Sequence, residues 1–165
     1  MKQKLQVNIL QDLECEIIGQ KLCRIDFRKD KSIFLGLGNR IQPRKENTCV
    51  SFYGEWELGS YNASWRILYD GKIVMASQSD SLKYKAREIQ VDSEFLLLQV
   101  QEITPYDIRI VFSNNLIFDF FSCHTEEDEL FHVLKTDGTW WEKSYSGEWK
   151  KGRDNIPLTP TNTNM

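Results

Sequence analysis

Hydrophobic and polar residues alternate along short stretches of the sequence, as they do in β-strands with one buried face. Between residues 23 and 28 hydrophobic side chains alternate with charged ones, and a polar turn at 29–31 leads into a hydrophobic stretch at 33–37. The segment 108–120 follows the same plan, and the asparagines of its turn tolerate the left-handed backbone of tight turns. Each of the two segments is therefore predicted to form a β-hairpin.

Other local patterns predict a third hairpin and short helices. Asp70 and Gly71 form a favoured two-residue hairpin turn, and they separate two further hydrophobic stretches. Hydrophobic residues recur at helical spacing within 10–17, which predicts a helix of about two turns near the N-terminus. The segment 78–92 has the same spacing, so a short connecting helix is predicted there.

The sequence also repeats itself. Residues 54–66 and 138–150 match at an offset of 84, and the identical pairs are Gly54 and Gly138, Trp56 and Trp140, Ser60 and Ser144, Tyr61 and Tyr145, and Trp65 and Trp149. The predicted hairpins at 23–37 and 108–120 match at similar offsets. We interpret these matches as a tandem duplication.

The duplication predicts one domain over residues 1–158. Its halves span 7–77 and 93–158, the linker spans 78–92, and the tail at 159–165 is expected to be flexible. A half of this size buries too little surface to be stable alone, so the halves are expected to pack together with pseudo-twofold symmetry. The expected fold is mainly β (β-rich α+β), with two tandem-duplicated, β-hairpin-based halves and one or two short helices.

Composition and charge narrow the classes of function. The 165 residues include 21 Lys and Arg against 24 Asp and Glu, and this net charge of −3 argues against nucleic-acid binding. No apolar segment resembles a signal peptide or a membrane span, so a cytoplasmic protein is expected. The four cysteines form no C-x-x-C pair and are expected to be reduced thiols.

The richest cluster of reactive side chains lies at 123–132. Cys123, His124 and His132 are potential metal ligands, but the spacing of eight between the histidines suits neither one helix face nor a zinc knuckle. No nucleophile motif, phosphate-binding loop or dinucleotide fingerprint is present in the sequence. We therefore predict no catalytic residues, no metal and no cofactor, and a metal-dependent hydrolase is the least favoured function.

Aromatic and charged residues suggest a binding surface instead. The four repeated tryptophans are expected to fill the core, whereas Trp141, which has Glu57 at the matching position, is expected to be an exposed interface anchor. Arg24 and Arg109, which match between the copies, are expected to be cross-strand ion partners. A run of acidic residues is expected to attract a basic partner and, with Trp141, forms the predicted interface: Glu126, Glu127, Asp128 and Glu129.

The first copy resembles a known class of proteins. Its pattern is G-x-W…S-Y…S-W-R-I…D-G-K-I, and the residues are Gly54, Trp56, Ser60, Tyr61, Ser64, Trp65, Arg66, Ile67, Asp70, Gly71, Lys72 and Ile73. This is similar to small cytosolic bacterial β proteins that are encoded beside polymorphic toxins as immunity proteins. The resemblance implies a non-enzymatic protein that binds a toxin domain. The second copy departs from the pattern after Trp149.

The leading hypothesis is therefore a protein-binding module, in particular one that neutralises a toxin. The alternative is a small-molecule or carbohydrate binder that uses the cleft between the two halves. The sequence predicts neither the identity of the partner nor the oligomeric state.

Overall fold

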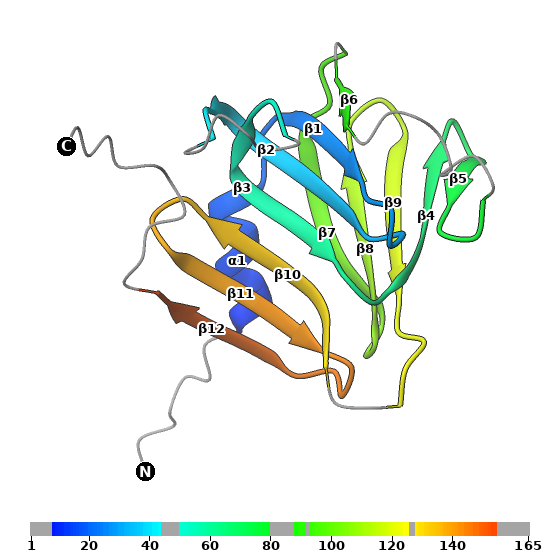
Figure 1. Cartoon of the computed structure of the whole chain (residues 1–165). Helices are drawn as coiled ribbons and strands as arrows, with labels where there is room; N and C mark the ends of the chain where they lie inside the picture. The colour runs from blue at the N-terminus through cyan, green and yellow to red at the C-terminus, as the bar shows by residue number, and fades with distance from the viewer. Residues whose placement is uncertain (1–7, 44–49, 80–87, 92, 126–127, 155–165) are drawn as a thin grey trace.

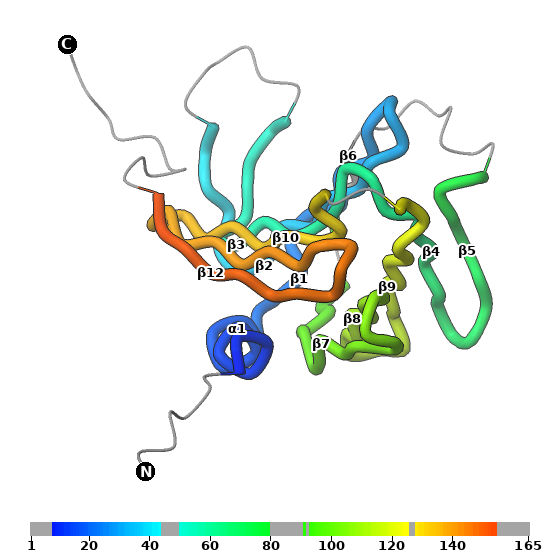
Figure 2. Tube along the Cα trace, turned by 90° about the horizontal axis from the view of Figure 1, so that it is seen from below, coloured from blue at the N-terminus to red at the C-terminus, as the bar shows by residue number. Residues whose placement is uncertain are grey.

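Two antiparallel β-sheets face each other, and the one helix among the described residues lies at an open side between them (Figures 1 and 2). The computed structural model describes residues 8–43, 50–79, 88–91, 93–125 and 128–154. The seven-stranded sheet has the order β12 (Trp149–Arg153), β11 (Thr139–Ser144), β10 (Glu129–Lys135), β3 (Tyr53–Ser60), β2 (Ile33–Ile41), β1 (Leu22–Phe27) and β6 (Glu88–Gln90). The five-stranded sheet has the order β5 (Lys72–Ala76), β4 (Ser64–Tyr69), β9 (Leu116–Phe121), β8 (Asp107–Phe112) and β7 (Leu97–Thr104). The predicted mainly β fold is confirmed.

The three predicted hairpins are present, and their turns adopt the expected backbone. Asn114 and Asn115, between β8 and β9, have φ of 58° and 59°. Asp70 and Gly71, between β4 and β5, have φ of 48° and 75°. Positive φ at both central residues is what a tight hairpin turn needs, and asparagine, aspartate and glycine adopt it at little cost.

The predicted N-terminal helix is confirmed as α1 (Ile9–Ile17). Its first turn is capped by Asn8, whose side chain accepts a hydrogen bond of 3.3 Å from the backbone N–H of Gln11. Leu13 and Ile17 are fully buried. The second predicted helix is not confirmed: most of 78–92 lies outside the described residues, and the described part at 88–90 is strand β6, paired with β1.

The chain crosses between the two sheets in both directions. β1, β2 and β3 form a meander in the large sheet, and the chain then crosses to the small sheet, where β4 pairs with β9. In the same way β7, β8 and β9 form a meander in the small sheet, and the chain crosses back so that β10 pairs with β3. By strand order, β1–β4 therefore correspond to β7–β10.

Neither the hairpin matches nor the tryptophan matches of the predicted repeat follow this correspondence, because the hairpin matches pair β1 with β8 and β2 with β9. Trp56 on β3 and Trp140 on β11 belong to the same sheet, and Trp56 is buried in the core whereas Trp140 is partly exposed. Trp65 lies in the small sheet and Trp149 on an edge of the large one. The duplication itself therefore stays a prediction.

One continuous hydrophobic core fills the space between the sheets and extends beneath α1. The helix contacts β7 and β12, which are edge strands of the two sheets, so it covers the side where the sheets separate (Figure 2). Within the described residues, no helix is long and apolar enough to cross a membrane.

The structure corrects the prediction that Trp141 is exposed. Its side chain is only 1% exposed because α1 lies over this part of the large sheet, and its indole N–H donates a 3.0 Å hydrogen bond to Asp12 of the helix. Trp141 is thus an anchor for the helix, not for a partner. Of the four repeated tryptophans, Trp56 and Trp65 are buried as predicted, whereas Trp140 is not in the core.

Candidate binding groove on the large sheet

A groove of about 320 Å³ opens on the face of the large sheet that points away from the core. Because Phe131 and Val133 of β10 are buried in the core, the alternation along the strand turns His132 and Leu134 to the opposite, outer face. The groove is lined by Tyr61, Glu129, His132, Leu134, Trp140, Trp141, Glu142 and Asp154. All of these except Tyr61, which follows β3, come from the β10–β12 region, so the groove lies where the two predicted halves meet.

The register of the sheet brings these side chains together. One row across the outer face joins, strand by strand, Asp26, Phe34, Gly59, His132, Glu142 and Lys150. The next row joins Arg24, Gly36, Glu57, Leu134, Trp140 and Gly152. At the glycines of these rows, neighbouring atoms lie close to where a Cβ atom would be, for example Ile33 O at 2.1 Å from such a position at Gly59.

At Gly152, the ring of Trp140 covers the neighbouring strand. A Cβ atom at position 152 would lie 2.2 Å from Cζ2 of the indole, which is far closer than van der Waals contact. The glycine therefore allows the indole to lie flat across β12 and to form part of the groove wall.

Tyr61 and His132, which line the groove, pack with Phe34 in a cluster of rings. The Tyr61 ring lies 4.9 Å from that of Phe34 and 5.5 Å from that of His132, measured between ring centroids. The guanidinium of Arg28 lies 4.0 Å from the centroid of Phe34, in the same cluster. His132 is 5% exposed, and its Nδ1 is hydrogen-bonded to Glu129. The buried histidine thus has a fixed position, while Tyr61 is 51% exposed and accessible.

The predicted acidic interface lies partly at this groove. Glu129 lines it directly. Asp128 directly precedes Glu129 but does not line the groove; it accepts hydrogen bonds from Asn62 Nδ2 at 2.9 Å and from the backbone N–H of Glu129 at 2.7 Å. Glu126 and Glu127 lie outside the described residues. Sequence reasoning had missed Tyr61, Trp140, Glu142 and Asp154; alternation along β11 indicates that Trp140 and Glu142 share a face, but only the strand pairing places that face outward.

The predicted ion partners are confirmed on both sheets. Arg109 donates to Asp119 on the neighbouring strand through Nε at 2.7 Å, and Arg66 donates to the same buried carboxylate at 2.8 Å. In the large sheet, Arg24 is 1% exposed and donates to Glu57 at 2.5 Å, across Gly36 of the intervening strand β2. Burial raises the pKa of Glu57 to about 7, although the positive charge of Arg24 acts in the opposite direction.

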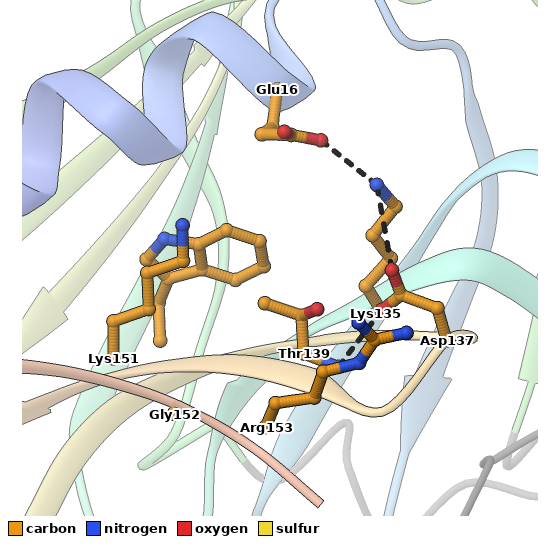
Figure 3. A pocket seen from close by; sticks show the side chains of 8 residues that line it. Glu16, Lys135, Asp137, Thr139, Lys151, Gly152 and Arg153 are labelled. Carbon is orange, nitrogen blue, oxygen red and sulfur yellow. Dashed lines mark hydrogen bonds and ion pairs between the residues drawn. The ribbon is translucent and has the colours of Figure 1, made fainter.

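A second cavity, of about 380 Å³, lies between α1 and the inner face of β10–β12 (Figure 3). Lys135 forms an ion pair of 2.9 Å with Glu16 and one of 3.9 Å with Asp137. Lys151 donates to Asp12 at 2.7 Å. Since most of these charges are already paired with one another, the cavity holds the helix on the sheet and offers little free charge to a ligand.

The residues considered as metal ligands do not converge. His124 stacks on Tyr145, with 5.3 Å between ring centroids, whereas His132 stacks on Phe34 and Tyr61. Among the described residues, no three His, Cys, Asp or Glu side chains are grouped as they would be around one ion. The described geometry thus offers no assembled site for metal-assisted hydrolysis.

Comparison with known proteins gives no match, whether with protein families, with curated proteins or with solved structures. The groove therefore has to be interpreted from its own geometry and charge.

Proposed function

We propose that this chain is a non-enzymatic protein-binding module that holds a basic segment of its partner in the outer groove. The observation that supports this most directly is the composition of the groove: two accessible aromatic side chains, Tyr61 and Trp140, beside the carboxylates of Glu142 and Asp154. Neither carboxylate forms an ion pair with another described residue. Aromatic anchors with a polar rim around them are typical of protein interfaces.

The electrostatics favour a basic partner. Glu129, Glu142 and Asp154 give the groove a negative potential, and the acidic Asp128 is next to it. This potential attracts lysine- or arginine-rich surfaces and repels the phosphates of nucleic acids. Because the groove is built on paired strands, its shape is set before binding, which lowers the entropy lost on association.

The resemblance of 54–73 to immunity proteins of toxin systems suggests the kind of partner. A cytoplasmic immunity protein binds its toxin tightly and stoichiometrically, without chemistry. An acidic groove would suit a toxin domain whose active surface is basic, as it is in enzymes that act on nucleic acids. We therefore propose a toxin domain as the partner.

The test is capture of the partner from the native cell. The tagged wild-type protein is expected to retain one protein at a stoichiometric ratio, and the double variant Trp140→Ala/Glu142→Lys is expected to lose it. Tyr106→Ala is a matched control, since Tyr106 is 51% exposed but lies on the small sheet, in the turn between β7 and β8. Absence of a stoichiometric partner, or equal retention by the groove variant, would contradict the proposal.

A second candidate function is carbohydrate binding, because the Trp140 ring lies over the backbone of β12 and lines the outer groove. Flat indole faces stack on sugars, and carboxylates accept hydrogen bonds from their hydroxyls. Binding to a neutral oligosaccharide would be insensitive to salt, whereas binding to a basic protein would weaken as the ionic strength rises. Screening the wild-type protein against neutral glycans at two salt concentrations separates the two functions.

A further inference from the structure

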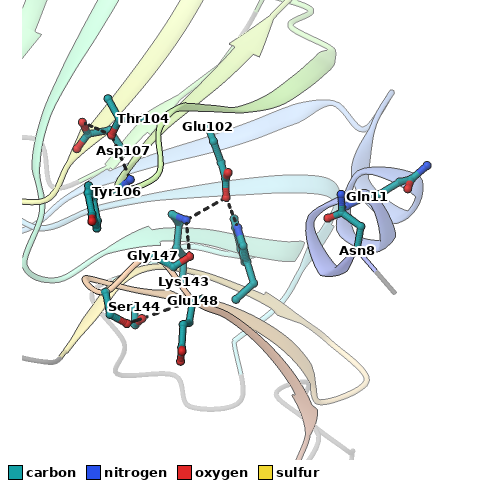
Figure 4. A network of polar contacts seen from close by, with 12 residues as sticks. Asn8, Gln11, Glu102, Thr104, Tyr106, Asp107, Lys143, Ser144, Gly147 and Glu148 are labelled. Carbon is teal, nitrogen blue, oxygen red and sulfur yellow. Dashed lines mark hydrogen bonds and ion pairs between the residues drawn. The ribbon is translucent and has the colours of Figure 1, made fainter. Parts of the chain in front are cut away.

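A recurring arrangement of three side chains stabilises this fold. A cationic side chain lies over an aromatic ring while its charged group pairs with a carboxylate. Three tryptophans take part, each with a lysine: Lys135 lies 5.5 Å from Trp56 and pairs with Glu16, Lys143 lies 5.3 Å from Trp149 and pairs with Glu102, and Lys151 lies 5.1 Å from Trp141 and pairs with Asp12. Figure 3 shows Lys135 with Glu16, and Figure 4 shows Lys143 with Glu102.

Of the three lysines, Lys143 is the most deeply buried. Lys143 is fully buried, and its Nζ donates to Glu102 Oε1 at 3.0 Å and to the Gly147 carbonyl at 3.1 Å (Figure 4). The indole N–H of Trp149 donates to the same Glu102 oxygen at 2.7 Å. A buried ammonium needs this combination of carboxylate, carbonyl and ring, because a buried cation without partners is costly.

Arginines form the same arrangement with phenylalanine and tyrosine. The three examples are Arg24 over Tyr53 with Glu57, Arg28 over Phe34 with Asp26, and Arg66 over Phe121 with Asp119. In six places within the described part of the chain, an aromatic ring beside a carboxylate thus holds a cation.

The Trp140 ring has carboxylates beside it in the groove, but no lysine or arginine of the described residues lies over the ring. Glu142 lies two positions along β11, and Asp154 lines the same groove. Lys150 is directly opposite Glu142 in the sheet, yet among the described contacts it forms no ion pair with Glu142 and does not lie over Trp140. Arg28 lies 5.8 Å from the ring centroid of Tyr61 in the same groove, so it is Trp140, with Glu142 and Asp154, that forms an arrangement of the same kind without its cation.

We infer that Trp140, Glu142 and Asp154 form a receptor for one cationic side chain, a lysine or an arginine, supplied by the protein partner. This rests on the proposed function and adds the chemical identity of the group at the centre of the interface. The ring contributes its negative face, and the two carboxylates offset the positive charge. A neutral side chain of the same length would gain only the apolar contact.

The experiment uses small probes and so does not depend on finding the partner. Wild-type protein labelled with ¹⁵N is titrated with Nα-acetyl-lysine methylamide and with Nα-acetyl-arginine methylamide, and the indole N–H signal of Trp140 is followed. Nα-acetyl-norleucine methylamide is the neutral control. Saturable shifts of the Trp140 signal are expected with one or both cations and not with norleucine, and the comparison shows which cation is preferred.

Two variants locate the effect. Glu142→Gln/Asp154→Asn keeps the shape of the side chains and is expected to weaken cation binding about fivefold. Lys150→Gln removes a nearby positive charge and is expected to bind the cations equally well or more tightly. Equal shifts with norleucine, or cation binding that is unchanged in the double variant, would overturn the inference.

The outcomes also separate this inference from the proposed function. If a stoichiometric partner is captured through the groove but the probes do not shift Trp140, the groove binds protein by another chemistry and the inference is wrong. If the probes bind as expected but no protein partner is captured, the cation receptor stands and the proposed function is wrong.

Discussion

The indole of Trp140 lies directly against the backbone of Gly152, and a Cβ atom at that position would approach the ring to 2.2 Å. The two residues are paired across β11 and β12, so neither can move without disturbing the edge of the sheet. This contact determines both the shape of the groove and the accessibility of the ring.

Gly152→Ala is expected to force the Trp140 ring off β12 and to lower the free energy of unfolding by about 1–3 kcal/mol, because the added methyl group overlaps the indole. Urea denaturation measures the loss of stability, and the Trp140 indole signal reports the movement of the ring. Lys150→Ala, on the same strand, is the control and should change neither. An unshifted Trp140 signal in Gly152→Ala would contradict the contact.

Asp12 is expected to be essential for the attachment of α1. It accepts hydrogen bonds from the Trp141 indole at 3.0 Å and from Lys151 at 2.7 Å. Asp12→Ala leaves the buried indole N–H without a partner, so the free energy of unfolding should fall by about 1–3 kcal/mol. Gln11→Ala, at an exposed position of the same helix, should have a much smaller effect in the same denaturation experiment.

Glu57 is expected to make the stability depend on pH. Its pKa rises from 4.5 to about 7 on folding, mainly through burial. Between these values the unfolded chain releases the proton while the folded protein keeps it, so a rise in pH favours unfolding. The free energy of unfolding, compared with that of Glu57→Gln, should fall by roughly 2–3 kcal/mol from about pH 4.5 to pH 7 and level off above.

The comparison with Glu57→Gln removes the contribution of every other titrating group, because the two proteins differ only at position 57. Denaturation curves at several pH values give the difference directly. A difference that does not change with pH would show that Glu57 is ionised throughout this range in the folded state.

The cysteines are expected to differ in reactivity. Burial raises the pKa of Cys23 to about 11, so very little of its thiolate is present at pH 8. Cys15 and Cys123 are exposed and free. Brief treatment of the native protein with iodoacetamide, followed by peptide mass spectrometry, should label Cys15 and Cys123 but leave Cys23 unmodified until denaturant is added. Rapid labelling of Cys23 in the native protein would contradict its burial.

The hairpins and the N-terminal helix were predictable because their causes are local. Two asparagines at 114–115 and the Asp-Gly pair at 70–71 favour tight turns through their own backbone preferences. The helix follows from the spacing of Leu13 and Ile17 and from the cap at Asn8. Such signals act over a few residues, and distant parts of the chain do not change them.

The positions of the two adjacent tryptophans were predicted the wrong way round. Successive residues of a strand point to opposite faces, so the sequence indicates that only one of Trp140 and Trp141 is buried. Matching Trp140 to the buried Trp56 suggested that it was Trp140. The choice depends on α1, which begins more than a hundred residues earlier in the chain and covers the face that contains Trp141.

The sequence by itself thus determined the class of the fold, its hairpins, its first helix and the negative charge near residue 128, because each depends on composition or on neighbouring residues. Only the tertiary structure decided which strands share a sheet, which tryptophan faces outward, and that Tyr61 meets Trp140 across one groove. The reason is physical: alternation defines two faces of every strand, but the pairing of distant strands and the burial of one face under a helix select the face that remains available for binding.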